Sequence, residues 1–306
     1  MSSSKMLDGK VVIVTGAGRG IGRGIAHMLS DAGASVVVND LGGGADGSGS
    51  DDSPASEVAR EITEKGGKAI ANFNSVSEWD SAHEIVAAAV EAFGRVDGLV
   101  NNAGIVRDAI FHKMTEADFD TVLNVHLKGS FNMSRACAPH FRQQETGCVV
   151  HMTSTSALIG NLGQANYMSA KLGIVGLSKS IALDMARYNV RSNCISPFAW
   201  SRLFGAVPDN TEEEKARLEK VKQMTPEKIA PLVTALFGDA ASDVTGQVFA
   251  VRNNEIFLMS QARPVRTAHT SDGWTPETVS ERVFSSFRAS MYPLDRTADV
   301  FTWDPV

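Results

Sequence analysis

Short runs of apolar, largely β-branched residues alternate with segments of helical periodicity along most of this 306-residue chain. The first run, residues 10–15, is followed by Ile21, Ile25, Met28 and Leu29, whose spacing places them on one helix face. Strands that are apolar throughout are buried on both faces, and strands separated by helices are joined by right-handed crossovers. The alternation predicts an α/β protein with a doubly wound parallel sheet.

The rest of the chain continues this alternation. Further strands are expected at residues 35–40, 69–73, 98–103, 148–154, 190–196 and 247–258. Helices are expected at residues 54–65, 78–93, 116–144, 164–188, 211–224 and 226–240. Residues 41–54 are rich in Gly, Ser and Asp and predict a mobile surface loop. A single domain over residues 8–260 is therefore expected, with residues 261–306 as a C-terminal extension.

Composition excludes several classes of function. The net charge is −6 with a pI near 5.7, and no basic run suggests nucleic acid or an anionic membrane surface as partner. No apolar run approaches the ~18 residues of a membrane-spanning helix, and no signal peptide precedes the first strand. Cys137, Cys148 and Cys194 lie far apart, which indicates buried free thiols in a reducing compartment and no metal site. A cytoplasmic location is expected.

A glycine-rich segment, TGAGRGIG at residues 15–22, joins the first strand to the first helix. Gly16, Gly20 and Gly22 give the spacing GxxxGxG. A helix N-terminus carries unpaired N–H groups and partial positive charge, and glycine lets the backbone approach a ligand closely. In a Rossmann-type sheet this turn binds the pyrophosphate of a dinucleotide, whereas a glycine cluster by itself is also compatible with an ordinary turn.

The second strand ends at Asp40, at the distance along the chain where an acidic side chain meets the adenosine ribose. A carboxylate there accepts hydrogen bonds from both ribose hydroxyls and repels a 2′-phosphate, which favours NAD over NADP. Arg19 instead favours NADP, because an arginine in the glycine loop can reach that phosphate. We expect Asp40 to prevail, since an exposed arginine can turn to solvent; the alternative is that Asp40 is only a turn residue.

Tyr167 and Lys171 are one helical turn apart, so an ammonium can stabilise tyrosinate and lower the pKa of the tyrosine. Such a pair is often just a solvated helix face. Here, however, Ser154 ends the preceding strand, at the carboxyl edge of the sheet where ligands bind. The prediction is that Ser154 hydrogen-bonds the reacting oxygen, Tyr167 exchanges the proton and Lys171 holds the ribose, while hydride moves to or from the nicotinamide.

Four motifs in order, TGAGRGIG, NNAG at residues 101–104, Ser154 and YMSAK at residues 167–171, resemble those of the classical short-chain dehydrogenase/reductase family. The resemblance covers roughly residues 8–260. It implies an oxidoreductase in which NNAG lines the adenine-ribose side and Ser75 and Val76 lie beside the adenine. The implied NAD contacts are Gly16, Arg19, Gly20, Ile21, Gly22, Asp40, Ser75, Val76, Asn102, Ala103, Gly104, Tyr167 and Lys171.

One position departs from the family pattern. The segment that normally begins with a catalytic asparagine reads HLKGSF, which places His126 at that position, with Asn124 two residues earlier. His126 either holds the water that links Lys171 to solvent or is a packed helix histidine. Together with the segments VVVNDLGGG and GNLGQANYMSAKLG, this histidine makes the chain similar to the (3R)-hydroxyacyl-CoA dehydrogenase domain of peroxisomal multifunctional β-oxidation enzymes.

That resemblance implies NAD-dependent oxidation of a 3-hydroxyacyl-CoA to the 3-oxoacyl-CoA. Alternative substrates are a hydroxysteroid, a terpene alcohol or a 3-oxoacyl-ACP, and a different class is a non-catalytic dinucleotide-binding regulatory subunit. Because the chain ends in Asp-Pro-Val and not in a peroxisomal signal, a free-standing enzyme is expected.

Substrate choice is expected to depend on a lid at residues 196–224. Its aromatic and apolar side chains either line an acyl pocket or pack the lid on the core: Phe198, Trp200, Leu203 and Phe204. Its cations either meet the phosphates of CoA or are solvated: Arg202, Lys215 and Lys222.

Association into a homodimer or homotetramer is expected through the helices at residues 116–144 and 164–188. The second helix offers four apolar residues to a two-fold axis: Ile174, Leu177, Ile181 and Leu183.

Overall fold

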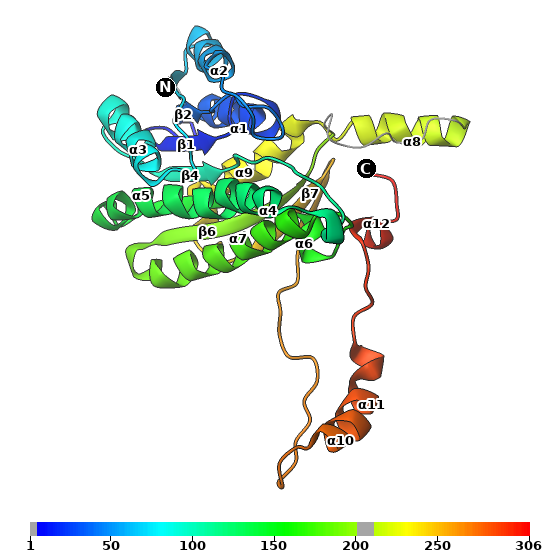
Figure 1. Cartoon of the computed structure of the whole chain (residues 1–306). Helices are drawn as coiled ribbons and strands as arrows, with labels where there is room; N and C mark the ends of the chain where they lie inside the picture. Colours follow the sequence, from blue (N-terminus) through cyan, green and yellow to red (C-terminus); the bar gives the residue numbers. More distant parts are fainter. Residues whose placement is uncertain (1–4, 201–210) are drawn as a thin grey trace.

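The computed structural model describes residues 5–200 and 211–306, which build one mixed sheet covered by helices on both faces (Figure 1). The strand order is β3-β2-β1-β4-β5-β6-β7-β8; all neighbours are parallel except the antiparallel pair of β7 and β8. The strands are β1 Val11–Thr15, β2 Ser35–Asn39, β3 Lys68–Asn72, β4 Gly98–Asn101, β5 Gly147–Met152, β6 Val190–Phe198, β7 Val248–Arg252 and β8 Glu255–Leu258. The order reverses between β1 and β4, which confirms the doubly wound Rossmann-type sheet.

The helices pack on the sheet through two hydrophobic clusters. Val12 and Val14 of β1 face the cluster under α1, α2 and α9, whereas Val11 and Ile13 face the cluster under α3 and α5. The central strands are therefore buried on both faces, as their apolar sequences predicted. The helices are α1 Gly20–Asp31, α2 Ser53–Glu64, α3 Trp79–Phe93, α4 Glu116–Leu123, α5 Gly129–Gln144, α6 Thr155–Leu158, α7 Ala165–Asp184, α8 Glu212–Lys222, α9 Ala230–Leu236, α10 Pro276–Thr278, α11 Ser285–Phe287 and α12 Thr297–Val300. Among the described residues, none of these helices has the length and apolar character needed to cross a membrane.

Two expected elements are interrupted. The helix expected at residues 116–144 consists of α4, a π-helical segment at Asn124–Lys128, and α5. The last strand is a hairpin of β7 and β8, because Asn253 adopts a left-handed conformation with φ of 57°. Asparagine tolerates that conformation better than most residues, so the Asn-Asn dipeptide at this position was a turn signal.

The loop at residues 41–54 contains no strand and gives way to α2 at Ser53. Its backbone nevertheless bonds to itself: Gly44 N donates to Ser48 O at 2.7 Å, and Asp51 N donates to Leu41 O at 3.1 Å. These bonds keep the loop folded beside the glycine-rich turn.

The C-terminal extension leaves the sheet after β8, carries α10 and α11 away from the body and returns through α12 (Figure 1). Its end is anchored by Phe301, which is 8% exposed and packs edge-on against Phe198 and Phe257, with ring centroids 5.0 and 5.3 Å apart. The last residues thus cover the ends of β6 and β8.

The face of α7 expected at a two-fold axis is divided between core and surface. Ile174 is buried against Cys194 and Val248, so it is not available to a partner. Leu183 is 78% exposed, and Leu172, three turns earlier on the same side, is 53% exposed. Leu177 and Ile181 are half-buried. Burial therefore corrects the expected set at Ile174, and the most exposed apolar positions of α7 are Leu172 and Leu183.

Candidate active site

The glycine loop occupies the turn from β1 to α1. Gly16 and Gly20 have φ of 62° and 53°, where only glycine is unstrained. A Cβ on Gly22 would lie 2.1 Å from Gly16 O, so this position excludes any side chain. Arg19 is the N-cap residue of α1 and its side chain makes no capping bond. The first N–H groups of α1 thus have no side-chain cap, as an anion site at this end requires.

Asp40 lies at the end of β2 against this loop. Its Oδ2 accepts from Gly18 N at 2.7 Å and its Oδ1 accepts from Gly42 N at 2.7 Å. The two bonds fix the carboxylate beside the glycine loop. Arg19 instead points to Asp51, with Nη2 3.9 Å from Oδ2 and both side chains exposed. The structure therefore holds the Asp40 side chain against the glycine loop and places the charge of Asp51 near that of Arg19.

The NNAG segment holds the glycine loop in place. Asn102 Nδ2 donates to Thr15 O at 3.0 Å and to Gly16 O at 2.9 Å. Thr15 Oγ1 accepts from the backbone nitrogens of Asn102 and Ala103 at 3.0 and 3.1 Å. A Cβ on Gly16 would lie 2.8 Å from Ala103 Cα, so the two segments are in direct contact. Thr15 thus links the glycine loop to the NNAG segment through its hydroxyl and its carbonyl oxygen, a role that its place in the sequence did not reveal.

Ser154, Tyr167 and Lys171 come together at the carboxyl edge of β5. Ser154 is the N-cap of α6, and its Oγ accepts from Ser156 N at 3.2 Å. Tyr167 and Lys171 share one face of α7, with Lys171 Nζ 5.5 Å from the centre of the tyrosine ring. Lys171 is buried and its Nζ donates to Met152 O at 2.7 Å, which ties it to the end of β5.

Burial dominates the protonation of this group. It lowers the pKa of Lys171 to about 7, a shift that Cys194 partly opposes. Burial also raises the pKa of Tyr167, while a hydrogen bond with Ser154 lowers it and the charge of Asp108 raises it. In the free protein the pKa of Tyr167 is thus raised, contrary to the expectation that Lys171 would lower it. The physical reason is that burial desolvates the tyrosine itself, which disfavours the charged tyrosinate form.

His126 lies in the π-helical segment between α4 and α5 and is buried. Its Nε2 is 2.7 Å from Ile105 O, and its ring meets Tyr167 edge-on at 5.4 Å. A Cβ on Gly104 would lie 2.3 Å from His126 Cε1, so the glycine of NNAG makes room for this ring. Burial, and then the charge of Lys171, lower the pKa of His126 to about 3. The histidine is therefore neutral and lies beside the Tyr167–Lys171 pair.

Two further expected contacts, Ser75 and Val76, lie just after the carboxyl end of β3. Val76 is buried, and its carbonyl accepts from Asn132 Nδ2 of α5 at 3.0 Å. Ser75 is half-buried, with Oγ 2.8 Å from Ser77 Oγ. In the lid, Lys215 and Lys222 form surface ion pairs with Glu212 and Glu219.

Phe198 contacts the C-terminal Phe301, and Trp200 N donates to Met224 O at 2.6 Å. Arg202, Leu203 and Phe204 lie outside the described residues. The structure thus describes the expected lid at residues 196–200 and 211–224.

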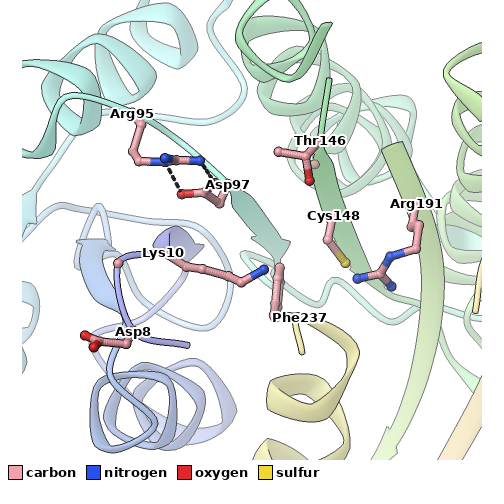
Figure 2. Close-up of a pocket in the computed structure, with 10 residues that line it drawn as sticks. Asp8, Lys10, Arg95, Asp97, Thr146, Cys148, Arg191 and Phe237 are labelled. Carbon is pink, nitrogen blue, oxygen red and sulfur yellow. Dashed lines mark hydrogen bonds and ion pairs between the residues drawn. The ribbon is translucent and has the colours of Figure 1, made fainter. Parts of the chain in front are cut away.

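A cavity of about 320 Å³ lies at the opposite edge of the sheet (Figure 2). Lys10, Arg95 and Arg191 line it at the starts of strands, but each already has partners: Asp239 for Lys10, Asp97 for Arg95, and two backbone carbonyls for Arg191. We therefore place the chemistry at the carboxyl edge.

The family model for short chain dehydrogenases matches residues 10–201. The chain belongs to the short-chain dehydrogenase family. A crystal structure of a short chain dehydrogenase from Mycobacterium avium superposes with a TM-score of 0.81 at 38% identity, covering 94% of this chain and 97% of the other. The fold and the oxidoreductase class are thereby confirmed.

Two relatives indicate which members of the family this chain resembles. The chain is 42% identical over 252 residues to the peroxisomal multifunctional enzyme type 2 of Mus musculus, covering 82% of this chain and 32% of that enzyme. It is 36% identical over 284 residues to a hydroxyacyl-CoA dehydrogenase of Mycobacterium tuberculosis, covering 88% and 86%. The resemblance to the multifunctional enzymes is confirmed, although the chain spans only about a third of the length of this one.

Proposed function

We propose that this short-chain dehydrogenase is an NAD-dependent enzyme that converts a secondary alcohol to a ketone, with a 3-hydroxyacyl-CoA as substrate and a 3-oxoacyl-CoA as product. The observation that carries the proposal is the meeting of Ser154, Tyr167 and Lys171 at the carboxyl edge of the sheet, the edge that also carries the uncapped N-terminus of α1. The named activity of the mycobacterial hydroxyacyl-CoA dehydrogenase supports the substrate class.

The residues of this chain fit a dinucleotide. The loop of Gly16, Gly20 and Gly22 takes the pyrophosphate on the N-terminus of α1, where no side chain competes. Asp40 takes the ribose hydroxyls and disfavours a 2′-phosphate, which supports NAD as cofactor. Asn102, Ala103, Gly104, Arg19, Ile21, Ser75 and Val76 surround the adenine-ribose half. When bound, the nicotinamide accepts or supplies the hydride.

The protein's own residues handle the proton. Ser154 Oγ hydrogen-bonds the substrate oxygen, and Tyr167 removes the hydroxyl proton during oxidation and returns it during reduction. Lys171, held by Met152 O, binds the nicotinamide ribose, and contact with an anionic cofactor favours its charged form, which in turn favours tyrosinate. His126 lies against the tyrosine ring as a neutral group.

The proposal is tested by following reduced nicotinamide absorbance with NAD or NADP and three alcohols: a 3-hydroxyacyl-CoA, a hydroxysteroid and a terpene alcohol. We expect turnover of the CoA ester with NAD. Tyr167→Phe should reduce kcat by at least about 100-fold while NADH binding persists, because only the proton-transfer group is lost. Turnover confined to another alcohol would reject the acyl-CoA substrate, and undiminished turnover of Tyr167→Phe would reject the mechanism.

We also propose a homo-oligomer that packs α7 against its two-fold mate, supported by the exposed Leu172 and Leu183. A cytoplasmic location and the division at residue 260 remain part of the same proposal.

A further inference from the structure

The cavity of about 320 Å³ lies at the amino edge of the sheet, where the parallel strands begin, and takes no part in the proposed chemistry (Figure 2). Its wall comes from residues at or just before the starts of β1, β4, β5 and β6, together with Phe237 after α9. Ligand pockets in proteins range upward from roughly 300 Å³, so this cavity has room for a small ligand. The ionisable groups in its wall are Asp8, Lys10, Arg95, Asp97, Cys148 and Arg191.

Arg95 and Asp97 neutralise each other within this wall. Arg95 Nε donates to Asp97 Oδ2 at 2.8 Å, and Arg95 Nη2 donates to Asp97 Oδ1 at 2.6 Å. Asp97 Oδ2 also accepts from the backbone nitrogen of Val11 at 2.9 Å. A two-pronged pair of this kind is strong and fixed in geometry. It therefore builds the wall between β1 and β4 and leaves the other charges of the cavity unbalanced.

Arg191 carries a positive charge whose hydrogen-bond acceptors are neutral. Its Nη1 donates to Val244 O at 3.3 Å and its Nη2 donates to Leu236 O at 2.7 Å. Backbone carbonyls orient a guanidinium but do not cancel its charge. A guanidinium has five N–H groups, so these two bonds do not exhaust its donors.

Lys10 is paired only at the protein surface. Its Nζ lies 3.3 Å from Asp239 Oδ1, and the side chain of Asp239 is 93% exposed. A pair with such an exposed carboxylate contributes little, because water screens it and the side chains are free to separate. Lys10 is thus available to a ligand that brings a negative charge into the cavity.

The two cations converge on one part of the cavity. Lys10 and Arg191 extend toward each other from opposite sides, beside Cys148 and Phe237, whereas the carboxylate of Asp8 points away from Lys10 Nζ (Figure 2). The thiol of Cys148 responds to both charges. Burial raises its pKa to about 11, while the charges of Arg191 and Lys10 each act to lower it. The fields of both cations therefore reach the same sulfur atom.

We propose that this cavity binds a phosphate group, held between Lys10 Nζ and the Arg191 guanidinium. A phosphate monoester carries a charge of roughly −1.5 to −2 at pH 7 and offers three acceptor oxygens, which match two cations with donors to spare. The cavity lies at the edge of the sheet opposite to Ser154 and Tyr167. It is therefore a binding site separate from the glycine loop, and it does not depend on the proposed function.

Calorimetric titration of the full chain with sodium phosphate tests the proposal, with sodium chloride at equal ionic strength as reference. Lys10→Gln should weaken phosphate binding at least about tenfold, the effect of losing one hydrogen bond to a charged group. Lys10→Arg keeps the charge and should retain the affinity. The matched control is Lys68→Gln, because Lys68 is exposed at the start of β3 and lies outside the cavity wall. It should bind phosphate like the wild type.

A second comparison separates this cavity from the glycine loop, which can also take a phosphate. Gly22→Ala should keep its affinity for inorganic phosphate, because Gly22 lies at the other edge of the sheet. Thermal unfolding without phosphate checks that each variant is folded. A loss of phosphate binding in Gly22→Ala without a loss in Lys10→Gln would place the anion on α1 and overturn the proposal.

The source of the phosphate is identified by repeating the titration with glycerol 3-phosphate. Tighter binding of inorganic phosphate would indicate the free ion, and tighter binding of the ester would indicate a small organic phosphate; both support the cavity as a phosphate site. Failure of both probes to bind the wild type, or equal affinities in the wild type and Lys10→Gln, would overturn it. None of these outcomes involves alcohol oxidation, so the proposed function is judged separately.

Discussion

Lys171 is a residue whose burial destabilises the folded protein when its side chain is charged. Its pKa falls from 10.5 to about 7 on burial, so the unfolded chain binds more protons than the folded chain between these values. Stability should therefore rise with pH from about 7 to about 10.5, and below 7 the full penalty applies. Under the proposed function, a bound cofactor favours the charged form of this lysine.

The corresponding prediction concerns Lys171→Met. Without a charge to desolvate, this variant should be more stable than the wild-type chain at pH 6, by up to a few kcal/mol at about 1.4 kcal/mol per pKa unit. It should also lose turnover. Urea unfolding at pH 6 and at pH 9 provides the measurement, and the gain should shrink at the higher pH. A loss of stability at pH 6 would show that the bond to Met152 O outweighs burial.

Residue spacing alone predicted the meeting of Ser154, Tyr167 and Lys171, because a strand end and a helix turn fix their positions locally. It did not predict the raised pKa of Tyr167 or the contacts of Thr15. These depend on burial and on neighbours distant in the sequence.

At the scale of elements, the turn from β1 to α1 is tightly constrained, because a Cβ on Gly22 would lie 2.1 Å from Gly16 O. The alternation of apolar runs predicted its position and the doubly wound character of the sheet, since crossovers of one hand leave few topologies. It could not predict the break between α4 and α5, where the π-helical turn accommodates His126. Nor did it separate β7 from β8, because both are equally apolar and only Asn253 marks the turn.

The glycine loop leads to a direct prediction. Gly22→Ala places a Cβ 2.1 Å from Gly16 O, so the loop must open and should bind NADH at least about tenfold more weakly. Fluorescence titration of NADH measures the effect. The control is Arg23→Ala, one residue further along α1, whose side chain bonds Glu61 away from the loop and should leave the affinity unchanged. Equal affinity in the Gly22 variant would show that this turn does not hold the pyrophosphate.

The exposed face of α7 leads to a second prediction at this scale. If Leu172 and Leu183 pack across a two-fold axis, Leu183→Lys buries a charge at the contact and should shift the protein toward the monomer. Light scattering after gel filtration measures the mass. Met6→Lys, also at an exposed apolar position, should leave the mass unchanged. An unaltered mass in the Leu183 variant would place the contact elsewhere.

For the whole molecule, the C-terminal extension is the feature that the sequence left least determined. Its segments are short and polar, and what fixes them is contact with residues far away in the chain. Phe301 enters an aromatic group with Phe198 and Phe257, and Asp304 Oδ2 lies 2.9 Å from Lys220 Nζ of α8. Such long-range docking leaves no periodic signal.

Phe301→Ala should therefore release the end of the extension without unfolding the sheet. Truncating a buried phenylalanine removes roughly 3–5 kcal/mol, more than a short docked segment can lose. Limited proteolysis should cut residues 262–294 faster in this variant, while the melting temperature of the body stays near that of the wild type. Leu294→Ala, at a fully exposed position, is the matched control. Equal cleavage rates would show that other contacts hold the end.

The C-terminal extension docks on the segment between two residues of the candidate active site. Thr297 N donates to Gly160 O at 2.9 Å, and Gly160 lies in the segment that joins Ser154 to Tyr167. If ligand binding orders this segment, it is thermodynamically linked to docking of the chain's last turn, and the linkage is reciprocal. Release of that turn would then weaken the ligand by the same factor by which the ligand strengthens docking. We therefore expect a bound ligand to slow proteolysis of the extension.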